Sequence, residues 1–170
     1  MATLEELAEI VGEEVEEDAD TLDLEEKELT EVPAAVCSLA AVEELFLDKN
    51  ALTTLPEAIS KMAALRELNV RQNQLTSLPT SVGQLKKLEG LFVAENQLVA
   101  LPDLSGCSSL AGINACQNKL KGLPDGLCKC STMEGLFGDD NEIAELPEEF
   151  GAMAGLEEVR WMGRRRRPSV

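Results

Sequence analysis

Few side chains in this sequence could support catalysis or metal binding, and those that could are not assembled into a site. The chain contains no histidine, which removes the commonest general base and the commonest zinc ligand. Asp139 and Asp140 are neighbours in the sequence, and no second acidic pair completes a cage for a hard metal ion. Cys116 is a candidate reactive thiol, but nothing around it indicates activation. We therefore predict that the protein is not an enzyme and uses no cofactor or metal.

Binding is the chemistry that the sequence favours, because two distant stretches repeat the same glycine and phenylalanine. Residues 89–98 read EGLFVAENQL, and residues 134–143 read EGLFGDDNEI. Aromatic residues make up only 3% of the chain, with four phenylalanines and one tryptophan. Aliphatic side chains must therefore build the core, and the placement of the few aromatic rings becomes informative.

The elements that position these residues follow a strict period. Proline occurs at 33, 56, 79, 102, 124 and 147, with spacings of 23, 23, 23, 22 and 23 residues. Asparagine occurs at 50, 73, 96, 118 and 141 and shares the same single-residue deletion. Two residue types with one period indicate a structural repeat. We expect the asparagine amides to turn inward and satisfy backbone groups of the turns.

Overlaid, the copies share L-x-x-L-x-L-x-x-N-x-L-x-x-L-P-x-x-I-x-x-L, as in LRELNVRQNQLTSLPTSVGQL from Leu65 to Leu85. This pattern resembles the intracellular leucine-rich repeat of Ras-binding and Ras-suppressor scaffold proteins and their plant relatives, over roughly residues 19–162. The resemblance implies an α/β repeat solenoid of about six or seven repeats, curved, with a short parallel sheet on its concave face. Strands are expected near 44–48, 67–71, 90–94, 112–116 and 135–139.

Both ends of such a stack need a cover. In the segment TLEELAEIVGEEVEE, Thr3 and Glu6 match a capping box, and apolar residues at 4, 7, 8, 11 and 15 share one helical face. We predict an acidic capping helix over 1–18, the solenoid over 19–162 and a basic tail over 163–170. At the far end, Trp161 is expected to pack over the small core residues Gly138 and Ala115.

Strand alternation predicts which residues face the concave side. The residues flanking each phenylalanine belong to the core, so Phe46, Phe92 and Phe137 are expected to point outward on alternate strands. Two residues earlier, Gly90, Gly112 and Gly135 predict a smooth floor from which the rings stand, and together they form a groove. The alternative is that the rings lie flat over neighbouring backbone. The predicted protein-binding residues are Phe46, Asn69, Arg71, Gly90, Phe92, Gly112, Asn114, Gly135, Phe137, Asp139 and Arg160.

Charge and cysteine usage limit the partners and the compartment. Residues 1–31 hold fourteen acids and one base, Lys27, which gives −13 of the net charge of −17. One interpretation is a solvated acidic cap that aids solubility. The acids also extend onto the concave face at Glu25, Glu26, Glu44 and Asp48, where they would attract a basic partner and repel nucleic acid. The chain has no long apolar stretch, so we expect no membrane span. Cys107 and Cys130 occupy one core position of adjacent repeats and are expected to be buried, reduced thiols, which favours a cytoplasmic location.

These features predict a non-catalytic scaffold or adaptor that binds a helix, peptide or domain of another protein and is monomeric or part of a larger complex. The resemblance implies that relatives dock on small GTPases or phosphatase catalytic subunits, or serve as structural subunits of assemblies such as flagellar dyneins. A purely architectural role therefore stays open. At the end of the chain, RRPSV at 166–170 matches a basophilic kinase pattern and makes Ser169 a candidate phosphorylation site.

Overall fold

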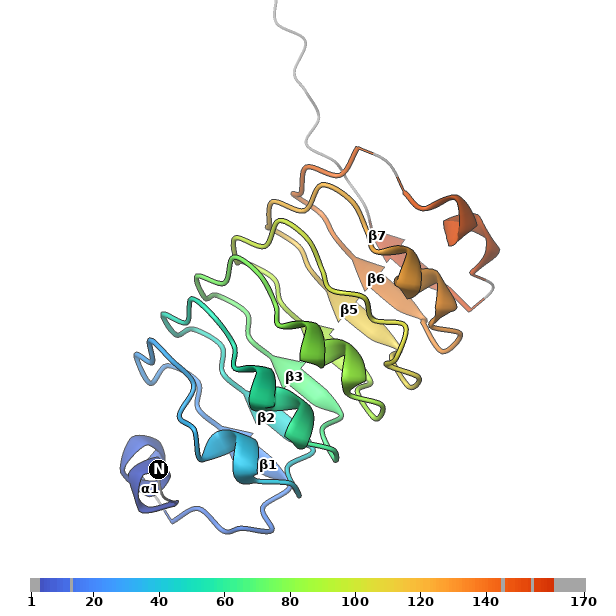
Figure 1. Ribbon diagram of the computed structural model, residues 1–170. Helices are drawn as coiled ribbons and strands as arrows, with labels where there is room; N and C mark the ends of the chain where they lie inside the picture. Colours follow the sequence, from blue (N-terminus) through green and yellow to red (C-terminus); the bar gives the residue numbers. More distant parts are fainter. Residues whose placement is uncertain (1–3, 13, 145, 154, 161–170) are drawn as a thin grey trace, which may run out of the picture.

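Each repeat contributes one short strand, and the strands lie side by side in chain order. The computed structural model describes residues 4–12, 14–144, 146–153 and 155–160. In this part of the chain a parallel sheet of seven strands has the order β1-β2-β3-β4-β5-β6-β7. The predicted fold class, a leucine-rich-repeat stack with one parallel sheet, is confirmed (Figure 1). The strands are β1 (Thr21–Asp23), β2 (Glu44–Phe46), β3 (Glu67–Asn69), β4 (Gly90–Phe92), β5 (Gly112–Asn114), β6 (Gly135–Phe137) and β7 (Glu158–Arg160).

The five predicted strands, β2–β6, start at the predicted residues but are three residues long instead of five. Backbone pairing nevertheless continues past their ends. The amide of Leu47 donates to the carbonyl of Asn69 at 2.8 Å, and that of Lys49 donates to Arg71 at 2.9 Å. The backbone then turns, because the residue before each position of the asparagine column (Lys27 in the first copy) adopts a left-handed conformation. These residues have φ between 51° and 58° and are Glu26, Lys49, Gln72, Glu95, Gln117 and Asp140.

The asparagine column holds these turns, as the sequence predicts. The Nδ2 of Asn73 donates to the carbonyl oxygens of Leu47 at 2.9 Å and Val70 at 3.1 Å. Its Oδ1 accepts from the amide of Leu52 at 2.9 Å. Asn96, Asn118 and Asn141 repeat this arrangement in the next three coils, and each donates to a carbonyl oxygen of the coil before its own. Each buried amide therefore links two coils, and the left-handed residue beside it is held by bonds that span the repeat.

The chain returns along the outer side through 3-10 helices that follow the prolines. They are η1 (Val36–Ser38), η2 (Glu57–Lys61), η3 (Thr80–Gln84), η4 (Asp125–Lys129) and η5 (Glu148–Ala152). Figure 1 shows them in a row opposite the strands. The 22-residue repeat has no such helix over residues 101–110. There the carbonyl oxygen of Asp103 lies against Gly83, so close that no Cβ would fit at Gly83.

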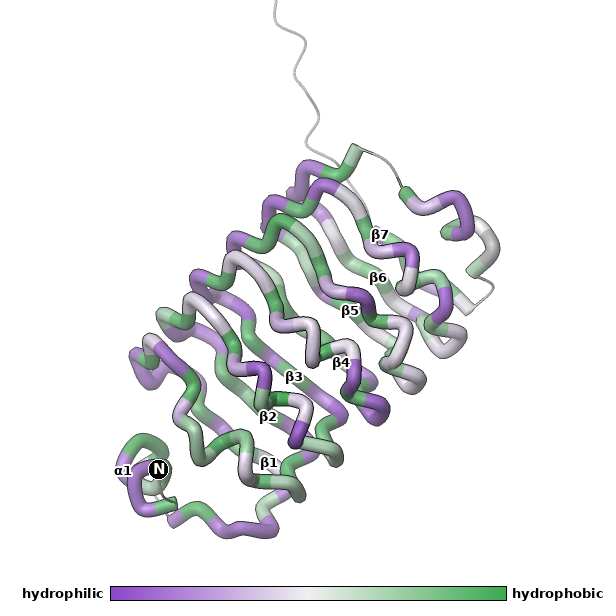
Figure 2. The backbone as a smooth tube through the Cα atoms, in the orientation of Figure 1, coloured by the Kyte–Doolittle hydropathy of each residue, from purple (hydrophilic) through white to green (hydrophobic). Residues whose placement is uncertain are grey.

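The core is one continuous column between the sheet and the outer side. The central residue of each strand from β2 to β6 is at most 1% exposed, and the next core position holds Leu24, Leu47, Val70, Val93 and Ala115, all at 0%. Figure 2 shows hydrophobic segments recurring at corresponding places in successive coils. Trp161, predicted to close the far end, lies outside the described residues.

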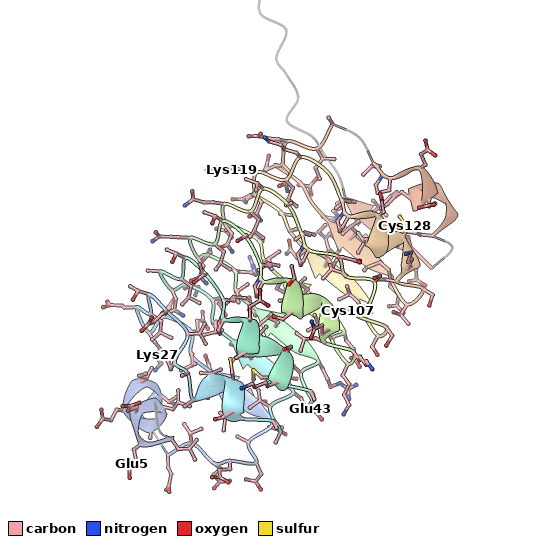
Figure 3. All side chains as sticks on the ribbon, in the orientation of Figure 1. Glu5, Lys27, Glu43, Cys107, Lys119 and Cys128 are labelled. Atoms are coloured by element: carbon pink, nitrogen blue, oxygen red, sulfur yellow. The ribbon has the colours of Figure 1, made fainter. Side chains whose placement is uncertain are left out.

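The N-terminal helix covers the first coil but ends earlier than predicted. In the described residues helix α1 spans Leu4–Val11, and Gly12, with φ +92°, ends it well before the predicted residue 18. Lys27 donates from Nζ to the carbonyl of Val11 at 3.0 Å, and Figure 3 shows it beside the helix. Leu7 is fully buried, and Val15 is buried although it follows the helix. The predicted capping box rests on Thr3, which lies outside the described residues.

Candidate binding surface on the concave face

The concave face consists of three residues from each coil: the first and third residues of the strand, and the residue two positions after the strand ends. In β3 these are Glu67, Asn69 and Arg71. The backbone register of the strands aligns phenylalanine and asparagine alternately, with Phe46 beside Asn69, Asn69 beside Phe92, and so on to Arg160. The three phenylalanines are half-buried, while the central strand residue beneath each is buried. The predicted alternation of inward and outward side chains is therefore present in the structure.

The rings of Phe92 and Phe137 do not stand up from the glycine floor, contrary to our expectation. A Cβ atom placed on Gly90 would lie 2.9 Å from Cε2 of Phe92. A Cβ on Gly135 would lie 3.3 Å from Cε2 of Phe137. Each ring thus leans back over the glycine of its own strand, because the missing side chain leaves room for it and covering backbone removes ring carbons from water. The repeated glycine and phenylalanine form one packing unit.

Gly112 differs from the other two glycines because nothing covers it. A Cβ atom built there would have no heavy atom within 4 Å. The third residue of its strand is Asn114, not a phenylalanine, and the neighbouring strands carry Phe92 and Phe137. We call this position the Gly112 gap: open floor at Gly112 between the Phe92 and Phe137 rings. The two outer strands are two spacings apart, about 10 Å, which lets one apolar side chain contact both rings at about 3.5–4.0 Å.

The asparagines between the phenylalanines are anchored to their own strand. Oδ1 of Asn69 accepts from the amide of Arg71 at 3.2 Å, and Oδ1 of Asn114 accepts from Cys116 at 3.2 Å. Such local bonds fix the orientation of the amide group. The floor around the Gly112 gap is therefore a set of ordered side chains on paired strands.

The concave face has a second region over β1–β3, where several carboxylates lie beside Phe46 and Asn69. Glu44 and Glu67 are direct neighbours across β2 and β3. Burial raises the pKa of Glu67, and the charge of Glu44 raises it further. Asp48 behaves similarly, with its pKa raised by burial and then by Glu25. We call Glu25, Glu44, Asp48 and Glu67 the acidic region.

The cations near the acidic region contact carboxylates other than those of Glu44 and Glu67. Lys49 contacts Glu25 at 2.7 Å and Glu26 at 2.8 Å, which lowers the pKa of Glu26. Arg66 contacts Glu89 at 2.7 Å and Glu43 at 3.8 Å. Among the described residues, no ion pair involves the neighbouring carboxylates, which are those of Glu44 and Glu67.

The charged residues predicted as binding residues lie at different places. Arg71 is half-buried beside the acidic region and contacts Glu95 at 3.5 Å. Arg160, on β7, contacts Glu158 within its own strand at 3.0 Å. The backbone of Asp139 accepts from the amide of Gln117 at 2.8 Å. Only Arg71 thus adjoins the acidic region, and Ser169 lies outside the described residues.

The predicted binding residues do not include Glu67, although the sequence carries a signal for it. The first strand position reads Thr21, Glu44, Glu67 and then three glycines. Reading that column as two halves, acidic and then open, would have singled out the Glu44 and Glu67 pair. Glycine is unusual within a strand and therefore indicates a special site, whereas exposed glutamates are common on protein surfaces and indicate little by themselves.

The thiols and carboxylates of the described residues are not gathered into a metal centre. All five cysteines are free, and Cys107 and Cys130 are buried as predicted. Burial raises the pKa of Cys116, and the nearby Asp139 and Asp140 raise it further, so this thiol is not activated. No group of three or more potential metal ligands is found in the described part of the chain. No helix there is long and apolar enough to cross a bilayer.

Comparison with known proteins supports the architecture. Residues 19–75 match the family model described as leucine rich repeat. A leucine-rich repeat protein of Leptospira interrogans is 29% identical with a TM-score of 0.74, over 78% of this chain and 34% of that one. YopM from Yersinia enterocolitica is 33% identical with a TM-score of 0.66, over 76% of this chain and 26% of that one.

The leucine-rich repeat domain of the type III effector XopL has a TM-score of 0.74 at 21% identity, over 82% of this chain and 50% of that one, and shows the fold alone. The chain thus spans half or less of the length of these structures. No curated protein matches significantly. The match over residues 19–75 and the strand register that continues to Arg160 show that the chain has the fold of a leucine-rich-repeat solenoid.

Proposed function

We propose that this protein is a non-catalytic interaction module, a scaffold or adaptor whose concave face binds another protein. The observation that carries the proposal is the Gly112 gap, where uncovered backbone lies between two half-buried aromatic rings. Glycine within a strand weakens the strand and often marks close approach of a ligand. Aromatic side chains on rigid elements are the groups that most often dominate binding energy.

The predicted binding residues divide into a centre and a periphery in this proposal. Gly112, Phe92 and Phe137 form the centre, and Asn114 lies between the rings in register. The periphery consists of Phe46, Asn69, Arg71, Gly90, Gly135, Asp139 and Arg160. A partner would gain most of its affinity at the centre, because contacts at an exposed rim contribute less.

An architectural role is the second candidate, supported by one end of the stack. Val159 on β7 occupies the column of buried central strand residues but is 43% exposed. Within the described residues β7 pairs only with β6. A subunit that contacts its assembly through this end would leave the concave face empty. Regulation of a small GTPase or a phosphatase is a specific form of the first proposal, in which that protein is the partner on the concave face. A reducing, cytoplasmic location fits the free thiols in either role.

Matched glycine substitutions distinguish the two roles. In Gly112→Leu the new side chain fills the gap, whereas in Gly122→Leu it enters equally open space away from the sheet. Proximity labelling in the native organism, with each full-length variant as bait, should lose specific partners with Gly112→Leu and keep them with Gly122→Leu. Retention of all specific partners by the Gly112→Leu protein would favour the architectural role.

A further inference from the structure

The occupant of the concave face can be described more closely, because the acidic region and the Gly112 gap lie on consecutive strands of one face. A surface hollow is lined by Glu43, Glu44, Arg66, Glu67, Glu89 and Gly90. It therefore extends from the acidic strands β2 and β3 to the first glycine strand, β4. The next strand, β5, carries Gly112. A bound segment that crosses the strands would meet carboxylates first and the apolar gap second.

The carboxylate pair is not explained by the stability of the fold. Glu44 and Glu67 lie directly opposite each other, and like charges in this arrangement destabilise neighbouring strands. Arg66, the nearest cation in the hollow, contacts Glu43 and Glu89 on either side. The carboxylates lie outside the core column, in which Leu45 and Leu68 of the same strands are fully buried. A basic group of a partner would relieve the repulsion.

We infer that the partner segment carries basic side chains together with one apolar anchor. This inference rests on the proposed concave-face function. The anchor fills the Gly112 gap between Phe92 and Phe137. The basic side chains meet Glu67 and Glu44, which lie two and three strands away, about 10–14 Å at strand spacing. An extended segment spans this distance in about three or four residues, and a helix in about seven to nine.

Charge complementarity selects this occupant over an acidic or neutral one. The acidic region has four carboxylates, of which only Glu25 contacts a lysine. Arg71, the basic residue beside them, is directed to Glu95. An acidic segment would add repulsion, and a neutral segment would leave Glu44 and Glu67 without a counter-charge as it covers them. Covering unpaired carboxylates disfavours binding, so a basic segment is the one that fits.

Selection of peptides from a random library tests this inference directly. The probe is a phage-displayed library of 16-residue peptides, selected on the immobilised full chain at low salt. Selected peptides are then measured on Gly112→Leu, on the double variant Glu44→Gln/Glu67→Gln, and on the matched control Glu148→Gln/Glu149→Gln. The control removes the same charge from exposed residues of η5, on the outer side of the stack.

The expected peptides are enriched in lysine or arginine and contain an aliphatic or aromatic residue. That residue should lie about three or four positions from the basic residues in an extended peptide, or about seven to nine in a helical one. They should lose binding to Gly112→Leu, weaken at least about tenfold on the Glu44→Gln/Glu67→Gln protein and with added salt, and bind the control normally. Peptides that need Gly112 but are neutral or acidic and ignore Glu44→Gln/Glu67→Gln would overturn the inference and leave the concave-face function intact.

Two other outcomes have separate meanings. Peptides that ignore both Gly112→Leu and Phe92→Ala would overturn the inference and the concave-face function together. A selected consensus that matches the chain's own residues 161–167 (WMGRRRR), and that binds more tightly when Arg164–Arg167 are replaced by glutamine, would assign the face to this tail. That result would contradict a separate basic partner.

Discussion

The acidic region over β1–β3 and the apolar floor over β4–β6 have the same backbone and the same core but opposite surfaces. Leu45, Leu68 and Leu91 are all fully buried beneath them, and pairing continues without a change of register. Above this common base, the first strand position changes from glutamate to glycine between Glu67 and Gly90. Inward residues are thus constrained by the repeat, whereas outward residues are free to carry function. Differences between repeats on the concave face are therefore the informative ones.

The largest predicted effect lies beneath both regions and should be the same in each. Leu68→Ala under the acidic region and Leu91→Ala under the floor each remove a fully buried side chain. We expect each to lower the free energy of unfolding by about 2–5 kcal/mol, measured by urea denaturation. A loss in one variant of less than about 1 kcal/mol would show that the two regions do not share one core.

The second prediction compares a tightly packed glycine with the open one. Gly83→Ala places a Cβ against the backbone oxygen of Asp103, so the chain must shift, at a cost of about 1–3 kcal/mol. Gly112→Ala meets open space, and its loss of unfolded-state freedom should leave stability unchanged or raised by up to about 1 kcal/mol. Thermal unfolding of both variants measures the difference. Equal destabilisation would mean that the Gly112 floor is covered.

The third prediction concerns the ring that leans over its glycine. Phe92→Ala removes a half-buried ring outside the leucine column and should lower the free energy of unfolding by about 1 kcal/mol. This is well below the effect of its neighbour Leu91→Ala. A loss as large as that of Leu91→Ala would assign Phe92 to the core rather than to the binding surface.

The smallest prediction is the pH dependence of the acidic region. The pKa of Glu67 is raised in the folded protein. Ionisation of Glu67 therefore destabilises the folded state at pH values above that pKa. This destabilisation disappears below the pKa of the unfolded chain, about 4.3, where the carboxyl group is protonated in both states. The Glu44→Gln/Glu67→Gln protein should be as stable as the parent, or slightly more stable, at pH 7. The two proteins should converge near pH 3. A double variant that is less stable at pH 7 would show that these carboxylates serve the fold.

Much of the solenoid follows from the sequence because its period repeats. The proline and asparagine spacings predicted where the five strands β2–β6 start, and the inward role of Asn73 is confirmed by its bonds to Leu47 and Val70. The end of α1 was also readable, because Gly12 directly follows the last apolar residue of the helix. The prediction extended the helix too far because the apolar pattern continued to Val15.

The geometry of the concave face could not be predicted in the same way. The ring of Phe92 leans over Gly90, which depends on the space left by one absent side chain and not on any periodic pattern. The left-handed conformations of Lys49 and Gln72 were likewise hidden, since neither residue favours them and tertiary hydrogen bonds impose them. Which glycine stays open therefore required the three-dimensional arrangement.

The central claim is that the floor between Phe92 and Phe137 is the working surface. It is tested most directly by measuring, by titration calorimetry, the affinity of a recovered partner for the full chain and for the Phe46→Ala/Phe92→Ala/Phe137→Ala variant. Circular dichroism and urea unfolding verify that the variant is folded. We predict a loss of at least about 2 kcal/mol, or about thirtyfold in Kd. Unchanged affinity in the folded triple variant would contradict the claim and favour the architectural role.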